Sequence, residues 1–445
     1  MGLTAPRRAI KLLIWGEKMT ANGHIPIEPF RILERTAASM PGVADLSGEI
    51  RQSLTGLGLP REKLSGRRIA VTAGSRGIAD LKEIVKSVCA WLKAQGARPF
   101  IIPAMGSHGG ATAEGQQAIL ADYGVTSEEV GAEIKSDMAT VLLGQTPEGF
   151  QVFVDRNAWE ADAVVVMNRV KPHTDFSGSI ESGLLKMITV GMGKRDGARE
   201  THRWSRKFGY ERVIRAISGL TLTKGKILCG LAVVENEMHQ IAALRAVLPE
   251  GIAAMEEATL PLARRLVPRL PFSKFQLLIV NEMGKNIAGT GMDTKTIGRG
   301  LNLPPGEGPE IGLIYVRDLT PESTGNATGI GQADLMHERL YRKIDLQKTY
   351  VNIQTSLNPR MARLPMYIAS DRGALDIALG NMGSPELGEQ RIIWIQNTLS
   401  LNRIAVTSTL AREAGALPGW QLVPHDYSLQ FDNEGNFTSS FIGSR

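Results

Sequence analysis

The chain has 445 residues, more than the roughly 250–300 at which a single hydrophobic core stops growing, so two packed domains are expected. Hydrophobic residues make up 43% and charged residues 22% of the sequence, a balance typical of a folded globular protein. The net charge of +6 is spread along the chain, which argues against a nucleic-acid partner. No apolar run approaches the ~18 residues that a membrane span requires.

An alternation of strand and helix begins at residue 67. Residues 67–72 are β-rich, residues 78–96 have helical apolar spacing, and residues 98–104 are β-rich again, which predicts a βαβ unit. The pattern continues with a helix at 111–124, buried strands at 162–168 and 226–236, and a helix at 251–267. This order is typical of a parallel α/β sheet.

Prolines after residue 267 interrupt the pattern, and a second alternation follows. It predicts strands at 275–282 and 310–318 and helices at 333–344 and 372–382. We therefore expect an α/β fold of two α/β domains with mostly parallel sheets and an active site in the cleft between them. The expected domains are 1–270 and 271–399, with residues 400–445 left open as a completion of the N-terminal domain.

Two cysteines, Cys89 and Cys229, lie far apart without a CxxC pair. The N-terminal apolar run is interrupted by Lys11 and Glu17, and no small-residue cleavage site follows it. These features predict a reduced, cytoplasmic protein with no membrane partner.

His108 follows a predicted strand in a loop that contains Gly106, Gly109 and Gly110. Glycines there let the backbone approach a ligand, so the position suits a proton-transfer group. A loop histidine that caps the next helix is an equal alternative. His202, flanked by arginines, would by itself be a surface residue.

His173 follows Pro172 just beyond another buried strand. The small, polar loop at 177–183, which begins with Ser177 and Gly178, indicates backbone amides that face a phosphate or carboxylate. A plain connecting loop is the alternative.

Lys186 has apolar neighbours, which predicts a partly desolvated amine with a pKa below the ~10.4 of free lysine. Such a lysine is a candidate covalent attachment point, although a lysine that extends to the surface is more frequent. Arg76, after Ser75, ends the first strand in a turn of small residues, where an arginine can grip a carboxylate or phosphate. An exposed arginine at a helix start is equally compatible with the pattern.

The order of these short motifs resembles the nickel-dependent lactate racemase superfamily of 2-hydroxy acid racemases and epimerases. The resemblance spans roughly residues 60–240. Its motifs are Ser75-Arg76, Gly106-Ser107-His108, Pro172-His173, Ser177-Gly178, Lys186 and His202.

The resemblance implies a nickel-pincer nucleotide, pyridinium-3-thioamide-5-thiocarboxylic acid mononucleotide, attached covalently to Lys186. His202 would complete a square-planar Ni(II) site. His108 and His173 would be the catalytic acid and base, and Arg76 would bind the substrate carboxylate. The loops at 74–77 and 177–183 would receive the cofactor phosphate.

In the second domain, Glu282 and Lys285 stand where the family has a Gln and a Lys that flank substrate and cofactor. They are expected to contact substrate across the cleft, or else to form an ordinary turn after a strand. The implied partners are a small 2-hydroxy acid and the host enzymes that make the cofactor, with a homo-oligomer left open.

Three other functions remain open at this point. A zinc hydrolase would use His108, His173 and His202 as a three-histidine site, but it would leave Lys186 without a role. A non-catalytic carrier of the nucleotide would keep Lys186 and His202 without needing both other histidines. A simple anion-binding α/β protein is the third.

Overall fold

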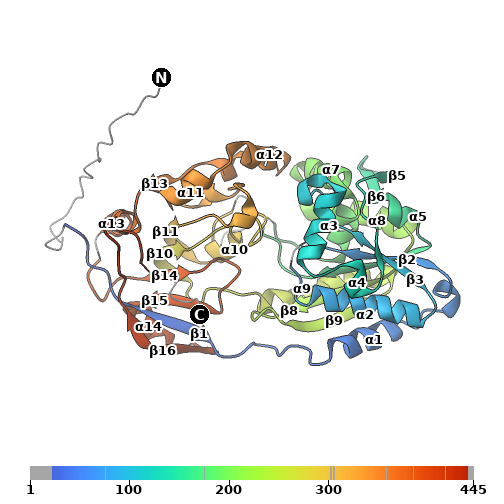
Figure 1. Ribbon diagram of the computed structural model, residues 1–445, viewed down its shortest axis with the longest axis horizontal. Coiled ribbons are helices and arrows are strands. Elements are labelled where there is room, and N and C mark those ends of the chain that lie inside the picture. Colours follow the sequence, from blue (N-terminus) through green and yellow to red (C-terminus); the bar gives the residue numbers. More distant parts are fainter. Residues whose placement is uncertain are drawn as a thin grey trace, which may run out of the picture.

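The structure is a computed structural model that describes residues 23–438, except for residues 76, 175, 301, 302, 304, 305, 357, 384 and 416 and the side chains of residues 355 and 356. Two α/β units lie side by side along the longest axis of the molecule (Figure 1). None of the helices in the described part of the chain has the length and apolar character that crossing a bilayer demands.

The first unit contains a six-stranded sheet. Its strands lie in the order β4 (Glu133–Ile134), β3 (Arg98–Pro103), β2 (Arg68–Ala73), β7 (Ala163–Arg169), β8 (Ile227–Glu235) and β9 (Ile241–Val247). All neighbouring strands are parallel except the antiparallel pair β8 and β9. A separate antiparallel hairpin joins β5 (Thr140–Gln145) to β6 (Gln151–Asp155).

Both faces of this sheet are buried, as parallel sheets require. Alternate residues of β2 point to opposite faces, so Ile69 and Val71 join one core and Ala70 joins the other. The first core includes apolar residues of α1 (Leu46–Thr55) and α2 (Leu81–Ala94). The second includes residues of α8 (Tyr210–Lys224) and α9 (Ile252–Leu266).

The second unit contains an eight-stranded mixed sheet. Its order is β13 (Met366–Ile368), β12 (Leu335–His337), β11 (Glu310–Val316), β10 (Lys274–Val280), β14 (Ile392–Ile395), β15 (Arg403–Thr407), β1 (Phe30–Arg35) and β16 (Trp420–Tyr427). The pairs from β13 to β14 are parallel, and those from β14 to β16 are antiparallel. The expected α/β class with mostly parallel sheets is confirmed.

The pairing of β1 corrects the expected domain limits. Phe30 pairs with Thr407 of β15 and Tyr427 of β16, so the first described strand belongs to the second unit, as does the segment after residue 400. The option that residues 400–445 complete the N-terminal domain is wrong for β15 and β16. The chain passes between the units twice, from β1 to α1 and from α9 to β10 (Figure 1). The local periodicity of the sequence cannot predict pairing between strands that are so distant in the chain.

The helix expected at 333–344 is also corrected. Its first part is the strand β12, which pairs with both β11 and β13, and only α11 (Glu338–Lys343) is helical. Leu335 and Met336 are buried in the sheet, so tertiary pairing overrides their helical spacing. The helix expected at 372–382 is confirmed as α13 (Asp371–Asn381).

Asp371 organises the second unit through a buried network of charged and polar groups. Its carboxylate accepts hydrogen bonds from Tyr315 Oη at 2.7 Å, Arg317 Nε at 2.7 Å, Arg339 Nη2 at 3.0 Å and the Phe437 N–H at 2.9 Å. Burial by itself raises the pKa of Asp371, but the hydrogen bonds from Arg317 lead a set of interactions that outweigh burial and lower the pKa to about 2. The ionised form is thus built into the fold.

We predict that Asp371→Asn lowers the free energy of unfolding of the second unit by about 3–5 kcal/mol, because it leaves the buried Arg317 charge without its partner. Denaturant unfolding measures the change, with Asp122→Asn at an exposed position of α3 (Ala113–Asp122) as the control. The network has no such role if the two variants unfold alike.

The same carboxyl predicts a direction of pH dependence. Its folded pKa of about 2 lies below the reference value of 3.8, so the stabilisation is present above pH 3.8 and is lost as the pH falls toward 2. The shift corresponds to roughly 2 kcal/mol. The free energies of unfolding of the wild type and of Asp371→Asn, measured between pH 5 and pH 2, should therefore become more similar as the pH falls.

Candidate active site

Three loops at one edge of the first sheet carry the predicted site residues. Gly74 and Ser75 follow β2, His108 follows β3, and His173 follows β7. Because β2 lies between β3 and β7 and all three strands are parallel, the two histidine loops flank the Ser75 loop. This edge is where open α/β sheets bind ligands.

Lys186 is brought to this edge by an unusual helical segment. It ends α6 (Leu184–Lys186) and is followed directly by the π-helical turn η3 (Met187–Gly191), a conformation often found at functional sites. A Cβ at Gly74 would lie 3.1 Å from Met187 Cε, and the Gly106 N–H donates to the Gly191 carbonyl at 3.2 Å. The turn therefore packs directly on the loops after β2 and β3.

His108 is fixed by the loop after β2. Its Nδ1 is hydrogen-bonded to the Ser75 hydroxyl, and the Ser75 carbonyl accepts a hydrogen bond from Tyr123 Oη at 3.2 Å. The Ser75 side chain thus contacts His108, which is a candidate catalytic residue. Arg76 lies outside the described residues, so its expected grip on a carboxylate stays a prediction.

His202 lies on α7 (Lys194–Phe208), a helix that the sequence analysis did not predict because its residues are mostly charged. Its Nδ1 is hydrogen-bonded to Tyr210 Oη at 3.1 Å. Burial first, and then the positive charge of Lys186, lower the pKa of His202 to about 4. The electrostatic effect places Lys186 close to His202, and the imidazole is neutral at pH 7.

An aromatic cluster joins His202 to His173. The Phe176 and Tyr210 rings stack at 4.9 Å with an interplanar angle of 10°. The His173 ring lies 4.5 Å from Phe176 and 6.1 Å from Tyr210, while His202 meets Tyr210 edge-on at 5.9 Å. Sequence reasoning missed Phe176 and Tyr210, because isolated aromatic residues form no motif. Tyr210 thus contacts both histidines and sets their relative placement.

Glu181 connects the loop that carries His173 to residues of both units. The buried Glu181 carboxylate accepts hydrogen bonds from the His173 N–H, from Arg264 and, at 3.1 Å, from Lys295 Nζ. Lys295 belongs to α10 (Thr294–Ile297) of the second unit, and the neighbouring Thr294 hydroxyl donates to the Thr174 carbonyl. The second unit therefore bears directly on the His173 loop.

Ser177 and Gly178, which are expected to receive the cofactor phosphate, lie in a loop that contacts the second unit. The Ser177 hydroxyl donates to both carboxylate oxygens of Glu307 at 2.9 Å, and the neighbouring Ser179 N–H donates to Glu211. Lys295 Nζ donates to the Ser177 hydroxyl at 2.9 Å, and Arg264 Nη2 donates to the Gly178 carbonyl at 2.7 Å. The loop is a contact between units, and binding of a phosphate there stays a prediction.

Glu282 and Lys285 have contacts within the second unit. Lys285 Nζ donates to Asn352 Oδ1 at 2.8 Å, and Glu282 Oε1 accepts from Asn397 Nδ2 at 3.1 Å. The contacts between the units include those of Lys295 and Thr294, which the sequence analysis did not single out. A substrate contact by Glu282 or Lys285 stays a prediction.

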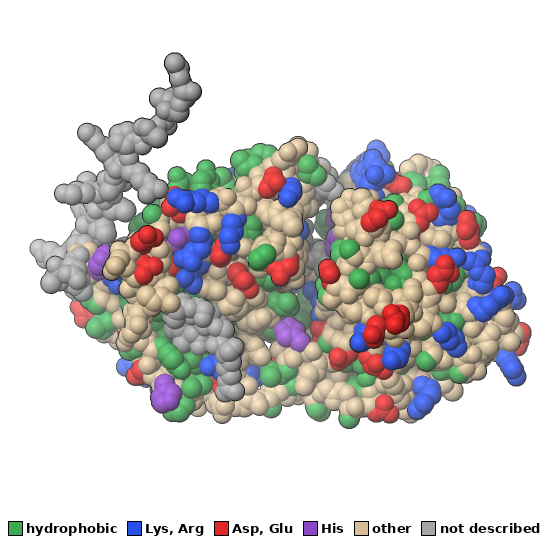
Figure 2. All heavy atoms as spheres, in the orientation of Figure 1, with side chains coloured by type: hydrophobic (Ala, Val, Ile, Leu, Met, Phe, Trp, Pro, Cys, Tyr) green, Lys and Arg blue, Asp and Glu red, His purple; other side chains and the backbone are tan. Residues whose placement is uncertain are grey.

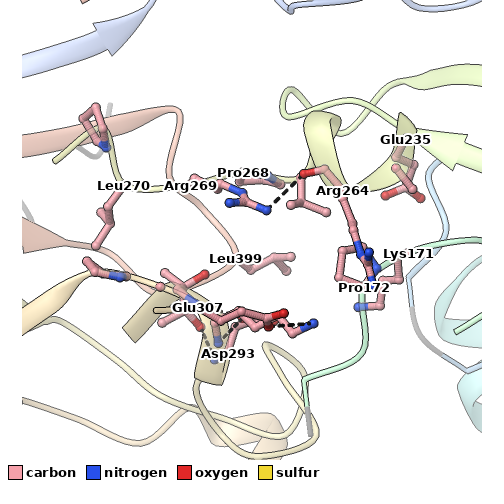
Figure 3. Close-up of a pocket in the computed structure, with 18 of the residues that line it drawn as sticks. Lys171, Pro172, Glu235, Arg264, Pro268, Arg269, Leu270, Asp293, Glu307 and Leu399 are labelled. Carbon is pink, nitrogen blue, oxygen red and sulfur yellow. Dashed lines mark hydrogen bonds and ion pairs between the residues drawn. The ribbon is translucent and has the colours of Figure 1, made fainter. Parts of the chain in front are cut away.

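Two cavities border the junction of the units, where Figure 2 shows the surface hollowed. One, of about 450 Å³, has Lys171 and Pro172 facing Asp293 and Glu307 of the second unit (Figure 3). The other, of about 1060 Å³, is lined by the Phe176 and Tyr210 pair together with Asn358. Nearby, α12 (Leu346–Ser356) of the second unit contacts α7 (Figure 1).

Across the described residues, no three His, Cys, Asp or Glu side chains are grouped so that they could hold a metal ion. His108, His173 and His202 are all described, so they do not form the three-histidine centre of the hydrolase alternative. A site with a single protein ligand is compatible with this arrangement.

We predict that the His202 pKa, followed by NMR in the protein without cofactor, lies near 4. Lys186→Met should raise it by removing a positive charge, yet leave it below 6.5 because burial is the larger cause. Lys207→Met, an exposed change on the same helix, is the control and should leave it unchanged. A wild-type value at or above 6.5 would contradict the placement of His202.

We also predict that Lys295→Met loosens the His173 loop, because Glu181 loses its partner in the second unit. Amide hydrogen exchange across residues 176–182 should accelerate about tenfold or more, since local opening sets the exchange rate. Lys274→Met removes an ion pair between exposed side chains and should have no effect there. Equal exchange in the two variants would show that the second unit does not hold this loop.

The sequence and fold were compared with those of known proteins. The family model of the lactate racemase N-terminal domain matches residues 62–209, and no curated protein matches the sequence. The chain is similar to the lactate racemase apoprotein from Thermoanaerobacterium thermosaccharolyticum, with 14% identity, a TM-score of 0.49 and coverage of 82% of this chain and 94% of that one. It is also similar to a structural-genomics protein from Thermotoga maritima, with 17% identity, a TM-score of 0.47 and coverage of 71% and 81%. Residues 62–209 are therefore similar to the lactate racemase N-terminal domain.

Proposed function

We propose that this protein is a racemase or epimerase that inverts the carbinol carbon of a 2-hydroxy acid with a nickel-pincer nucleotide. One observation carries the proposal: the fold gathers Lys186 and His202 beside two loops that each present another histidine. The match of residues 62–209 to the lactate racemase N-terminal domain supports the same class of reaction.

The residues present fit the cofactor. Lys186, beside the close-packed glycine loops, would carry the covalent bond, and the neighbouring His202 would ligate nickel. Tyr210 engages Nδ1 of His202, which leaves Nε2 as the ring nitrogen for a metal. When bound, the cofactor would supply a pyridinium ring that accepts a hydride and returns it.

The chain itself supplies the proton chemistry. Inversion needs one acid–base group for each face, because the hydroxyl points in opposite directions in the two enantiomers. His108 and His173 come from strands on either side of β2, so a substrate bound over the β2 loop lies between them. Histidine takes and gives protons near neutral pH, which suits both directions of the reaction.

Residues of both units are proposed to bind the substrate. Arg76, three residues after the end of β2 in the sequence, is the residue that we propose for the substrate carboxylate. The cavity of about 1060 Å³ is the proposed entry, since Phe176 and Tyr210 form part of its wall and contact the two histidines. Glu282 and Lys285 would close on the substrate from the second unit.

We predict two classes of variant in protein co-expressed with the enzymes that make the cofactor. Lys186→Ala and His202→Ala should lose bound nickel, whereas His108→Ala and His173→Ala should keep nickel and lose interconversion of 2-hydroxy acids by at least 100-fold. Intact-protein mass, metal content and chiral analysis of the acid measure these effects. His425→Ala, at an exposed position, is the control.

The outcomes separate the alternatives. An added mass on Lys186 with nickel but no activity on any 2-hydroxy acid would favour a carrier. Zinc bound to an unmodified chain would favour the hydrolase. Loss of nickel in His108→Ala would contradict the assigned roles.

A further inference from the structure

Lys194 is a fully buried lysine at the first position of α7. Its ammonium group forms an ion pair with Asp155 at 2.9 Å, and both side chains are 0% exposed. Its backbone is left-handed, with φ of 52°, although it is not a glycine. Lys194 lies eight residues after Lys186 and eight before His202.

Each of these features opposes folding on its own. A buried ion pair is often no more stabilising than apolar residues of the same size, because both charges lose their hydration. A positive charge at a helix N-terminus opposes the helix dipole, and a left-handed lysine is strained. Burial also raises the pKa of Asp155, although Lys194 counteracts it. Strain combined with a buried charge is typical of residues retained for placement.

The ammonium group of Lys194 has three polar partners, and they show which segments it connects. Besides Asp155, Lys194 Nζ donates to the Pro103 carbonyl at 2.5 Å and to Gln116 Oε1 at 3.2 Å. Pro103 ends β3, immediately before the His108 loop. Lys194 therefore ties the end of β3 to the start of α7.

Gln116 extends this hold into the loop itself. Its side chain is 0% exposed, and its Nε2 donates to the Gly106 carbonyl at 3.0 Å and to the His108 carbonyl at 3.3 Å. The amide thus has Lys194 on one side and the backbone of the proton-transfer loop on the other. A direct chain of hydrogen bonds links the Asp155 and Lys194 pair to His108.

We propose that Lys194 and Gln116 are positioning residues that hold the His108 loop in register with the helical segment that carries Lys186 and His202. The role of His108 in this inference rests on the proposed function. Catalysis through two histidines requires each base to stay within a fraction of an ångström of its working position. Lys194 meets this need because one buried group bonds to β3, to α3 and to Asp155, which ends β6 and caps α5 (Arg156–Glu160).

The first experiment is amide hydrogen exchange across residues 104–112 in the protein without cofactor. Gln116→Leu should accelerate exchange there at least tenfold, because the loop carbonyls lose their donor. Gln117→Leu is the matched control, since it changes an exposed glutamine next to Gln116 on α3. Unchanged exchange in Gln116→Leu would overturn the inference.

Two further variants separate placement from folding. Gln116→Glu retains an acceptor for Lys194 but places a carboxylate against the loop carbonyls, so it should also accelerate exchange. The double variant Asp155→Asn with Lys194→Met removes both buried charges together, so neither is left unpaired. Faster exchange confined to residues 104–112, with an unchanged midpoint of thermal unfolding, is the expected result. Faster exchange throughout the first unit would show a merely structural role.

Loaded enzyme supplies a second readout. Gln116→Leu should lower kcat about 10–100-fold while KM and nickel content stay as in the wild type, since misplacing a catalytic group slows chemistry without altering binding. A rise in KM at constant kcat would contradict the positioning role. Exchange is measured without cofactor, so it decides the inference even if the wild type proves inactive on 2-hydroxy acids. Failure of the proposed function is thus distinguishable from failure of the positioning role inferred for Lys194 and Gln116.

Discussion

The carboxyl ends of β2, β3 and β7 meet at one edge of the first sheet because neighbouring parallel strands run in the same direction. The rest of the site depends on this constraint. It sets Ser75 between the loops of His108 and His173, and the π-helical turn after Lys186 packs on the loops after β2 and β3. Glycines at the contact points let these backbones approach one another.

Two buried charged groups, Glu181 and Lys194, connect the histidine loops to the rest of the fold. The buried Glu181 receives a lysine from the second unit while it holds the backbone of His173. The buried Lys194 plays the matching part on the His108 side, through Gln116. The two histidine loops are therefore held differently, the His173 loop across the junction of the units and the His108 loop within the first unit. Movement of the second unit is expected to act on the His173 side first.

Local patterns in the sequence were sufficient for much of the fold. The strands β2, β3, β7, β8, β10 and β11 and the helices α2, α9 and α13 lie close to their expected ranges, because long apolar runs and regular spacing are local properties. The order of short motifs predicted the resemblance that the match of residues 62–209 to the lactate racemase N-terminal domain supports, and it singled out Lys186 and His202.

Other features depend on residues that are distant in sequence. The pairing of Phe30 with Thr407 joins opposite ends of the chain, and no local periodicity encodes it. The sequence around Ser177 gives no sign of Glu307, which accepts the Ser177 hydrogen bond from more than a hundred residues away. Tyr210 and Lys194 carry no motif, since their roles arise only from what the fold packs around them. Residue types and their spacing therefore determined the chemistry available to this chain, whereas packing between distant segments decided which groups meet and which are buried.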